Sequence, residues 1–361
     1  MRVVTLGEVM LRLAPQNHLR LRQSIPGDLE STFGGGELNV AVSIACQGGH
    51  SAFVTASPDN AITDSLVQEM RKTGVDSSLI YRSQQGRFGI YFVETGANQR
   101  GGTVTYDREF SSIALASTEL FDWDQIFQGA TWFHITGITP AISESAAELT
   151  RRALHEARQR NVTVSCDLNF RKKLWNWKEN SKPIDLARET MQSLMPYVDL
   201  VIANEEDADL SLGIKAPESD VEAGNLNIQG YISVAKQMTE QYPNVKQVAI
   251  TLRESISASH NNWGAMLYDQ NQTCFAPSDA DGNYSSYQIR NIVDRVGAGD
   301  SFAGALIFAL NTPELASLET AIRYAVAASC LKHSIQGDFN YSTRSEIESL
   351  MSGGGSGRVQ R

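Results

Sequence analysis

The chain has little cysteine, and its cysteines form no motif. Cys46, Cys166, Cys274 and Cys330 are spread over 361 residues with no C-x-x-C pair. This spacing argues against a structural metal site and against a disulfide-stabilised secreted domain. It favours free thiols in a reducing compartment, and we therefore expect a cytoplasmic protein.

Long hydrophobic runs and an excess of positive charge are also missing. No apolar stretch approaches the roughly 20 residues that a membrane span requires. Residues 1–8 have the pattern of a buried strand and lack the apolar core and cleavage site of a signal peptide. The formal net charge of −10 argues against nucleic acid or an anionic membrane surface as a partner. Arginines placed locally would therefore have to attract any anionic substrate.

What is present suits a soluble globular protein. With 42% hydrophobic and 20% charged residues, the 361-residue chain is long enough for one large α/β domain or two smaller ones. Apolar strand patterns alternate with helical patterns, which predicts a mostly parallel sheet covered on both faces. The predicted strands are Val3–Leu6, Ser51–Thr55, Trp132–Ile135, Val162–Cys166, Leu200–Ala203 and Gln247–Thr251. The predicted helices are Leu38–Gln47, Ala61–Thr73, Ser143–Gln159, Asp185–Met195 and Ile232–Tyr242.

Some segments break this alternation. Residues 11–32 and 87–108 contain short stretches of period two, which indicate small antiparallel strands projecting from the body as a lid. Residues 214–230 are polar and acidic, and we expect a surface excursion there. We assign residues 1–350 to one domain and 351–361, rich in glycine and serine, to a flexible tail.

The most informative motif is the stretch 294–302, Asp-Arg-Val-Gly-Ala-Gly-Asp-Ser-Phe, which precedes a helical pattern. Gly297, Ala298 and Gly299 allow a tight turn, and the N–H groups at the start of a helix bind anions. Asp300 in the same turn can accept a proton from a substrate hydroxyl. The alternative is a plain turn in which Asp300 caps the helix. An anion cradle beside a base favours phosphoryl transfer to an alcohol.

Three further polar clusters follow predicted strands or open helices. Gly34, Gly35 and Asn39 combine a glycine turn with an amide that suits sugar hydroxyls. Asp167, Asn169 and Arg171 stand at the end of a strand, and the guanidinium fork of Arg171 can hold a carboxylate or a phosphate. The run 204–207, Asn-Glu-Glu-Asp, follows another strand. Each cluster also has a structural explanation, as a capped helix or a surface ion pair.

Together these motifs resemble the ribokinase/PfkB family of sugar kinases over nearly the whole chain. The family pattern D-T-x-G-A-G-D-x-F is matched except at Arg295, where Thr is usual, and N-x-x-E is matched except at Asp207, where Glu is usual. The resemblance implies a three-layer ribokinase-like α/β/α sandwich with a small β-sheet lid. It also implies ATP and Mg²⁺ as cofactors, and in parts of the family a monovalent cation near the Gly-Ala-Gly-Asp turn.

The resemblance further implies roles for single residues. Asp300 would be the base, and Gly297, Ala298 and Gly299 would form the anion cradle. Asn204, Arg253 and Gly264 would lie near the nucleotide, with adenine between 289–293 and 325–333. Asp207 or Glu206 would hold Mg²⁺ through water. Gly34, Gly35, Asn39, Asp167 and Asn169 would face the sugar.

Substrate choice is expected to depend on the lid. Tyr91, Tyr106, Arg108 and Arg171 resemble positions that the 2-keto-3-deoxygluconate kinase branch uses on its acid substrate. Cationic donors around a carboxylate would favour a sugar acid. A neutral-sugar kinase (fructose or ribose), a nucleoside kinase and a non-catalytic sugar sensor remain alternatives. An exposed lid sheet also offers an edge for pairing with a second copy.

Overall fold

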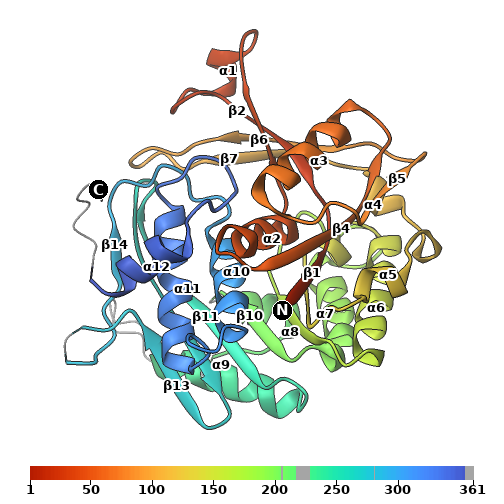
Figure 1. Cartoon of the computed structure of the whole chain (residues 1–361). Coiled ribbons are helices and arrows are strands. Elements are labelled where there is room, and N and C mark those ends of the chain that lie inside the picture. The colour runs from red at the N-terminus through yellow and green to blue at the C-terminus, as the bar shows by residue number, and fades with distance from the viewer. Residues whose placement is uncertain (205, 217–227, 280, 354–361) are drawn as a thin grey trace.

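A sheet of ten strands forms the centre of the molecule (Figure 1). The structure is a computed structural model that describes residues 1–204, 206–216, 228–279 and 281–353. The strand order is β13-β12-β11-β10-β9-β8-β1-β4-β5, with β14 paired to β12. The parallel strands are β1 (Arg2–Leu6), β4 (His50–Pro58), β5 (Ile80–Ser83), β8 (Trp132–Thr136), β9 (Thr163–Asp167), β10 (Leu200–Ala203) and β11 (Gln247–Ser257). The antiparallel strands are β12 (His260–Asp269), β13 (Gln272–Ala276) and β14 (Tyr287–Ile289).

Helices cover both faces of this sheet, as the alternation predicts. One face carries α2 (Gly36–Cys46), α10 (Ala298–Leu310) and α11 (Leu318–Lys332), with α12 (Arg344–Met351) packed on α11. The other face carries α5 (Trp123–Phe127), α6 (Glu144–Gln159), α7 (Pro183–Leu194) and α9 (Ile228–Gln241). Two more helices pack on these, α3 (Ala61–Thr73) against α2 and α8 (Asp207–Leu212) against α7.

The helix α6 illustrates how the sequence specifies these layers. Ser143 caps it by accepting a hydrogen bond from the N–H of Ala146 at 3.0 Å. Leu149, Ala153 and Ala157, spaced four residues apart, are fully buried against the sheet. Its opposite face carries exposed arginines and glutamates, so one amphipathic stripe fixes its orientation.

A second sheet of four strands forms the lid, in the order β3-β2-β6-β7. Its strands are β2 (Met10–Ala14), β3 (Glu30–Gly34), β6 (Gly89–Glu94) and β7 (Thr103–Asp107). Buried and accessible residues alternate along β2 and β6, which agrees with the period of two in the sequence. The expectation of antiparallel strands is wrong for β2 and β6, which pair in parallel. The chain between them passes through β3, α2, β4, α3 and β5, so no tight turn forces a hairpin.

The sequence patterns locate most elements to within a few residues, but not all. β11 continues past Thr251 to Ser257, and β12, β13 and β14 extend the sheet beyond the predicted strands. Most of the excursion at 214–230 lies outside the described residues, as does the tail from residue 354 on. Met351, assigned to the tail, is the last residue of α12. In the described ranges no helix combines the length and apolarity needed to cross a membrane.

Candidate active site

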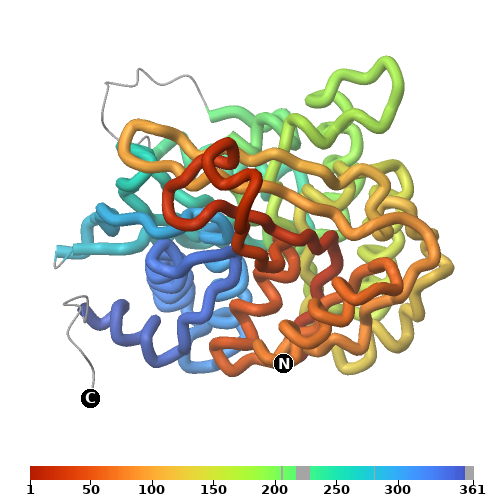
Figure 2. The backbone as a smooth tube through the Cα atoms, turned by 90° about the horizontal axis from the view of Figure 1, so that it is seen from above, coloured from red at the N-terminus to blue at the C-terminus, as the bar shows by residue number. Residues whose placement is uncertain are grey.

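A cavity of about 390 Å³ opens at the carboxyl ends of the parallel strands. Seen from above, the β6–β7 hairpin in orange and the red segment that includes β2 and β3 cross in front of other parts of the chain (Figure 2), and Met10, Tyr91 and Tyr106 of these strands line the cavity. Residues at or after the ends of β1, β8, β9 and β10 line the cavity, together with Thr251 and Arg253 within β11 and the start of α10. Ligands of open parallel sheets bind at this position.

The Gly-Ala-Gly-Asp turn forms one wall of the cavity. Gly297 has a φ of +82°, and a Cβ built there would lie 2.0 Å from the carbonyl oxygen of Asp338. Only glycine fits this position. Gly299 is exposed, and a Cβ built there would have no neighbour within 4 Å. α10 begins at Ala298, whose N–H donates to the carbonyl oxygen of Arg295 at 3.4 Å. Because first-turn N–H groups of a helix can bind an anion, the cradle stays a prediction at this position.

Asp300 lies in this turn and is partly buried at the wall of the cavity. The Nδ2 of Asn39 donates to its Oδ2 at 2.6 Å. Burial raises the pKa of Asp300 to about 7, with Asp338 adding to the shift and the Asn39 hydrogen bond and Arg171 opposing it. A carboxyl group that titrates near neutral pH is suited to accept a proton from a hydroxyl.

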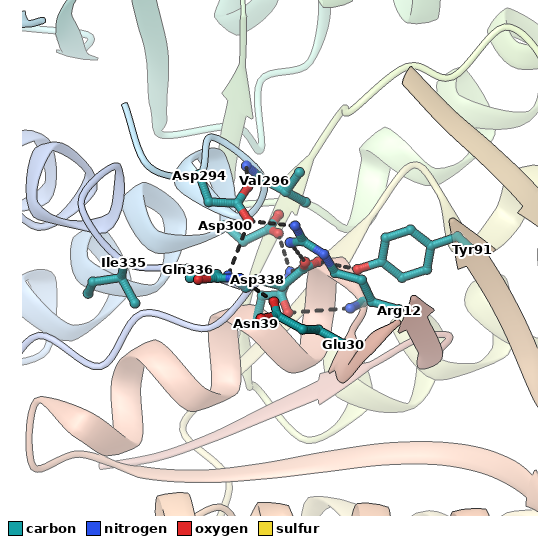
Figure 3. A network of polar contacts seen from close by, with 12 residues as sticks. Arg12, Glu30, Asn39, Tyr91, Asp294, Val296, Asp300, Ile335, Gln336 and Asp338 are labelled. Atoms are coloured by element: carbon teal, nitrogen blue, oxygen red, sulfur yellow. Dashed lines mark hydrogen bonds and ion pairs between the residues drawn. The ribbon is translucent and has the colours of Figure 1, made fainter. Parts of the chain in front are cut away.

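A buried polar network ties the lid to this turn (Figure 3). Arg12 of β2 donates to the Oδ2 of Asp294 at 2.5 Å and to the Oδ1 of Asp338 at 2.7 Å. Tyr91 of β6 donates its hydroxyl to the Oδ2 of Asp338 at 2.7 Å. Burial would lower the pKa of Arg12, but Asp338 and Asp294 raise it above its usual value. Gly34 packs beneath this network, since a Cβ there would meet Asp338 and Tyr91 at 2.3 Å.

The polar cluster after β9 lies at the same cavity. Burial raises the pKa of Asp167 well above its usual range, Asp207 and Asp300 add to the shift, and Arg171 opposes it. Asn169 lines the cavity with a left-handed φ of +37°, a conformation that asparagine tolerates. Arg171 is exposed to the cavity and donates to the carbonyl of Phe170 at 3.2 Å. Among the described residues it has no carboxylate at ion-pair distance.

Arg108 has a different environment. It lines the cavity but is 8% exposed and forms an ion pair with Glu8, and its guanidinium carbon lies 5.2 Å from the ring centroid of Tyr106. The structure therefore brings Arg108 and Arg171 to one cavity, yet Arg108 already has a counter-ion. Glu8 gave no sequence signal, because it follows β1 outside every motif.

The acidic cluster after β10 divides into two parts. Asp207 is buried, and its carboxylate accepts hydrogen bonds from the N–H groups of Phe170 and Asn204 at 3.0 and 3.1 Å. It lines the cavity with Asn204 and Asp167, whereas Glu206 is exposed and does not. Burial raises the pKa of Asp207, so a nearby cation would be favourable. A hydrated Mg²⁺ suits neighbouring carboxylates that repel one another, and it keeps several of its waters when bound. In the described ranges no group of three or more Asp, Glu, His or Cys side chains is placed to hold a metal ion directly.

Arginines gather at the end of the cavity formed by β11 and the loop before α10. Arg253 and Arg295 both line it, and burial lowers the pKa of Arg295, with Arg253 adding to the shift. His333 and Trp263 line the same end, with ring centroids 5.3 Å apart.

Gly264 does not reach the cavity. It lies within β12 beside the hydroxyl of Tyr284, 2.3 Å from its Cβ direction. Of the described residues in 289–293 and 325–333, His333 is the one that lines the cavity.

Comparison with known proteins decides the family. A model of the pfkB family of carbohydrate kinases matches residues 1–340. The chain belongs to this family. The 2-dehydro-3-deoxygalactonokinase of Haloferax volcanii is 31% identical over 357 residues, 98% of each chain. The 2-dehydro-3-deoxygluconokinase of Bacillus subtilis is 25% identical over 350 residues, 97% of this chain and 95% of that one.

The fold of this pfkB kinase is also that of a solved relative. The crystal structure of 2-dehydro-3-deoxygluconokinase from Thermotoga maritima superposes with a TM-score of 0.87 and 44% identity, covering 98% of this chain and 99% of that one. The expected ribokinase-like fold, with a large mostly parallel sheet and a small separate sheet, is therefore confirmed. So is the expectation of a carbohydrate kinase.

Sequence reasoning missed several residues of this site. Arg12, Asp338, Glu8, Glu37 and Trp263 carried no assigned role. Glu37 is buried with a pKa raised by burial, and its carboxylate accepts from both hydroxyls of Thr136 and Thr139 at 2.7 and 2.8 Å. Of these residues, Arg12 is the one that the sequence could have marked, because it is a charged residue within the otherwise apolar strand β2.

Proposed function

We propose that this pfkB kinase transfers the γ-phosphoryl group of ATP to the primary hydroxyl of a 2-keto-3-deoxy sugar acid. The preferred substrate would be 2-keto-3-deoxygluconate (2-dehydro-3-deoxygluconate), and the product its 6-phosphate. The observation that carries the proposal is Arg171, a cation on the cavity without a carboxylate partner among the described residues. A guanidinium in that position suits the carboxylate of a sugar acid, whereas a neutral sugar needs no such charge.

The chain's own residues suggest how the reaction proceeds. Asp300 accepts the proton of the attacking hydroxyl, and its pKa of about 7 makes the base available at neutral pH. Asn39 holds the carboxylate in place through its 2.6 Å hydrogen bond. The N–H groups of Gly297, Ala298 and Gly299 and the dipole of α10 stabilise the charge on the transferred phosphoryl group. Positioning and electrostatics supply most of the rate in such transfers.

The two ends of the cavity have different roles in this proposal. Asn169, Tyr91 and Tyr106 would contact the sugar acid beneath the lid, together with Gly35 and Asp167. Arg253 and Arg295 would face the phosphates of ATP, with Asn204 nearby. Asp207 and Asp167 would hold Mg²⁺ through water, and the ion would neutralise the phosphates. Gly34, Gly264 and Glu206 are left outside this assignment because none of them lines the cavity.

A coupled ADP-release assay tests the proposal. With ATP and Mg²⁺, turnover of 2-keto-3-deoxygluconate should exceed that of fructose and ribose, because only the acid engages Arg171. Preference for a neutral sugar would contradict the acid-substrate assignment while leaving Asp300 as the base. The galactonate epimer belongs in the same series, since the Haloferax relative is named for it. Absence of turnover with every sugar would favour a sensor.

Two further expectations accompany the proposal. All four cysteines are free thiols, which suits the cytoplasm, and fractionation of cells that express the chain would test this location. All five residues of the lid strand β7 are exposed at the edge of the sheet. Pairing of this edge with a second copy stays a prediction, which sedimentation of a β7 variant would test.

A further inference from the structure

Two cations of the protein itself lie behind the Gly-Ala-Gly-Asp turn. Arg12 is 3% exposed between Asp294 and Asp338. Lys332, the last residue of α11, is fully buried, and its Nζ donates to the carbonyl oxygen of Ile335 at 3.0 Å. Burial lowers the pKa of Lys332, while Asp294 and Asp338 oppose that shift. Both cations therefore act on the same pair of carboxylates.

Three groups near the turn already receive hydrogen bonds at their oxygens. Asp294 accepts from the N–H of Val296 at 3.0 Å on Oδ1, and from Arg12 and the N–H of Gly337 on Oδ2. Asp338 accepts from Arg12 on Oδ1 and from Tyr91 on Oδ2. The carbonyl oxygen of His333 accepts from the N–H of Val293 at 2.8 Å. A metal ion would compete with an N–H or O–H group at each of these oxygens.

The charges of this buried group also balance. Asp294 and Asp338 are 3% and 4% exposed, and Arg12 and Lys332 are 3% and 0% exposed. Two carboxylates thus lie with two cations in a largely buried group, in which Arg12 forms the ion pairs and Asp338 also lines the cavity. Beside these four groups a further cation would have only Asp300 to compensate it, and a buried charge without a full counter-ion is costly. The monovalent cation that the family resemblance implies near the turn does not fit these residues.

We propose that Arg12 and Lys332 serve as built-in cations of the turn, so that this kinase requires no monovalent metal ion. Lys332 is a positioning residue in this arrangement. Its ammonium group holds the segment that leads to Asp338, whose carbonyl oxygen packs directly against Gly297. The cradle therefore stays in place without an added ion. The inference rests on the proposed function only for its kinetic readout.

A cation titration of the wild-type chain tests the inference. Activity and Tm are measured as K⁺ or Na⁺ replaces tetramethylammonium at constant ionic strength, up to about 100 mM. We expect activity to change by less than about twofold and the Tm of the substrate-free protein by less than about 1 °C, because an ion that binds the native state must raise its Tm. A saturable increase of about tenfold in activity, or a Tm that rises with K⁺ alone, would overturn it.

A variant tests the part assigned to Lys332. Lys332→Met keeps the length and removes the charge, and we expect weaker ATP binding that K⁺ or NH₄⁺ partly restores. Lys72→Met is the matched control, because Lys72 is exposed and pairs with Glu69 on α3, and it should behave as wild type. A folded Lys332→Met variant with unchanged ATP affinity and no response to cations would overturn the role of Lys332.

The two readouts separate this inference from the proposed function. If Lys332→Met does not fold, the wild-type titration still decides whether a monovalent ion is needed. The Tm is measured without substrate, so a cation-dependent Tm contradicts the built-in cations whatever the enzyme phosphorylates. A cation-independent Tm in a chain that ignores every sugar contradicts the substrate assignment alone.

Discussion

Replacing Asp300 by Asn should inactivate the enzyme and stabilise it at the same time. Asn is nearly isosteric, and its side-chain oxygen can still accept the hydrogen bond from Asn39 that measures 2.6 Å in the structure. Loss of a general base costs about 10²–10⁴-fold in turnover. The fold should be retained, and ATP binding should change little, because the N–H groups of the turn remain.

The gain in stability follows from the pKa shift. An unfolded aspartate titrates near pH 3.9, whereas Asp300 in the fold has a pKa of about 7. The native state therefore favours the protonated carboxyl. Its contribution is fully present below about pH 4 and is lost as the pH rises through about 7. At 1.36 kcal/mol per pKa unit the whole effect is about 4 kcal/mol, of which about 2.5 kcal/mol falls between pH 5 and pH 8.

Urea unfolding at pH 5 and at pH 8 measures this difference. The free energy of unfolding of Asp300→Asn, relative to wild type, should rise by about 2–3 kcal/mol from pH 5 to pH 8. In the wild type, kcat/KM should rise with pH and level off above about pH 7. A variant that turns over within a few-fold of wild type, or a stability difference that does not depend on pH, would refute the assignment of Asp300.

Other substitutions test other parts of the site. Arg171→Leu should raise the KM for the sugar acid by about 10–100-fold, with little effect on the KM for ATP, because a charge-assisted hydrogen bond is lost; steady-state kinetics with each substrate varied will decide. Arg253→Leu should have the opposite pattern, raising the KM for ATP. Arg12→Leu leaves Asp294 and Asp338 buried without the cation that pairs with them directly, and should lower the free energy of unfolding by about 3–5 kcal/mol in urea titrations; an unchanged midpoint would contradict the network. Gly297→Ala forces a Cβ to within 2.0 Å of the Asp338 carbonyl oxygen at a positive φ, so phosphoryl transfer should be lost, and near wild-type activity would contradict the tight turn.

Capping residues and hydrophobic periodicity predicted the helices and strands whose ends are set by neighbouring residues. The helix at Ala61–Thr73 was predicted with its observed bounds, because Asn60 caps its start and Gly74 ends it. The parallel pairing of β2 and β6 was not predicted, since it depends on a crossover of more than 70 residues and not on any local turn.

The candidate site divides in the same way. Motifs indicated the Gly-Ala-Gly-Asp turn, Asn39, Asp167 and Arg171, all of which line the cavity. Arg12 and Asp338 are separated by 326 positions, and each looks like an ordinary surface charge until the fold brings them together. Gly264 was expected near the nucleotide, but its Cβ direction meets Tyr284 and not the cavity. Successive residues of β12 face opposite sides of the sheet.

The ion pair between Arg12 and Asp338 also bears on how the chain is made. Synthesis proceeds from the N-terminus, and domains acquire their structure as the chain emerges. The lid strand β2 is among the first segments to appear, but both of its buried carboxylate partners lie in the last fifth of the chain. Until Asp338 has left the ribosome, the Arg12 guanidinium is a charge without its full set of partners. A nascent or C-terminally truncated chain can thus build most of the central sheet before the ion pairs that join β2 to Asp294 and Asp338 have formed.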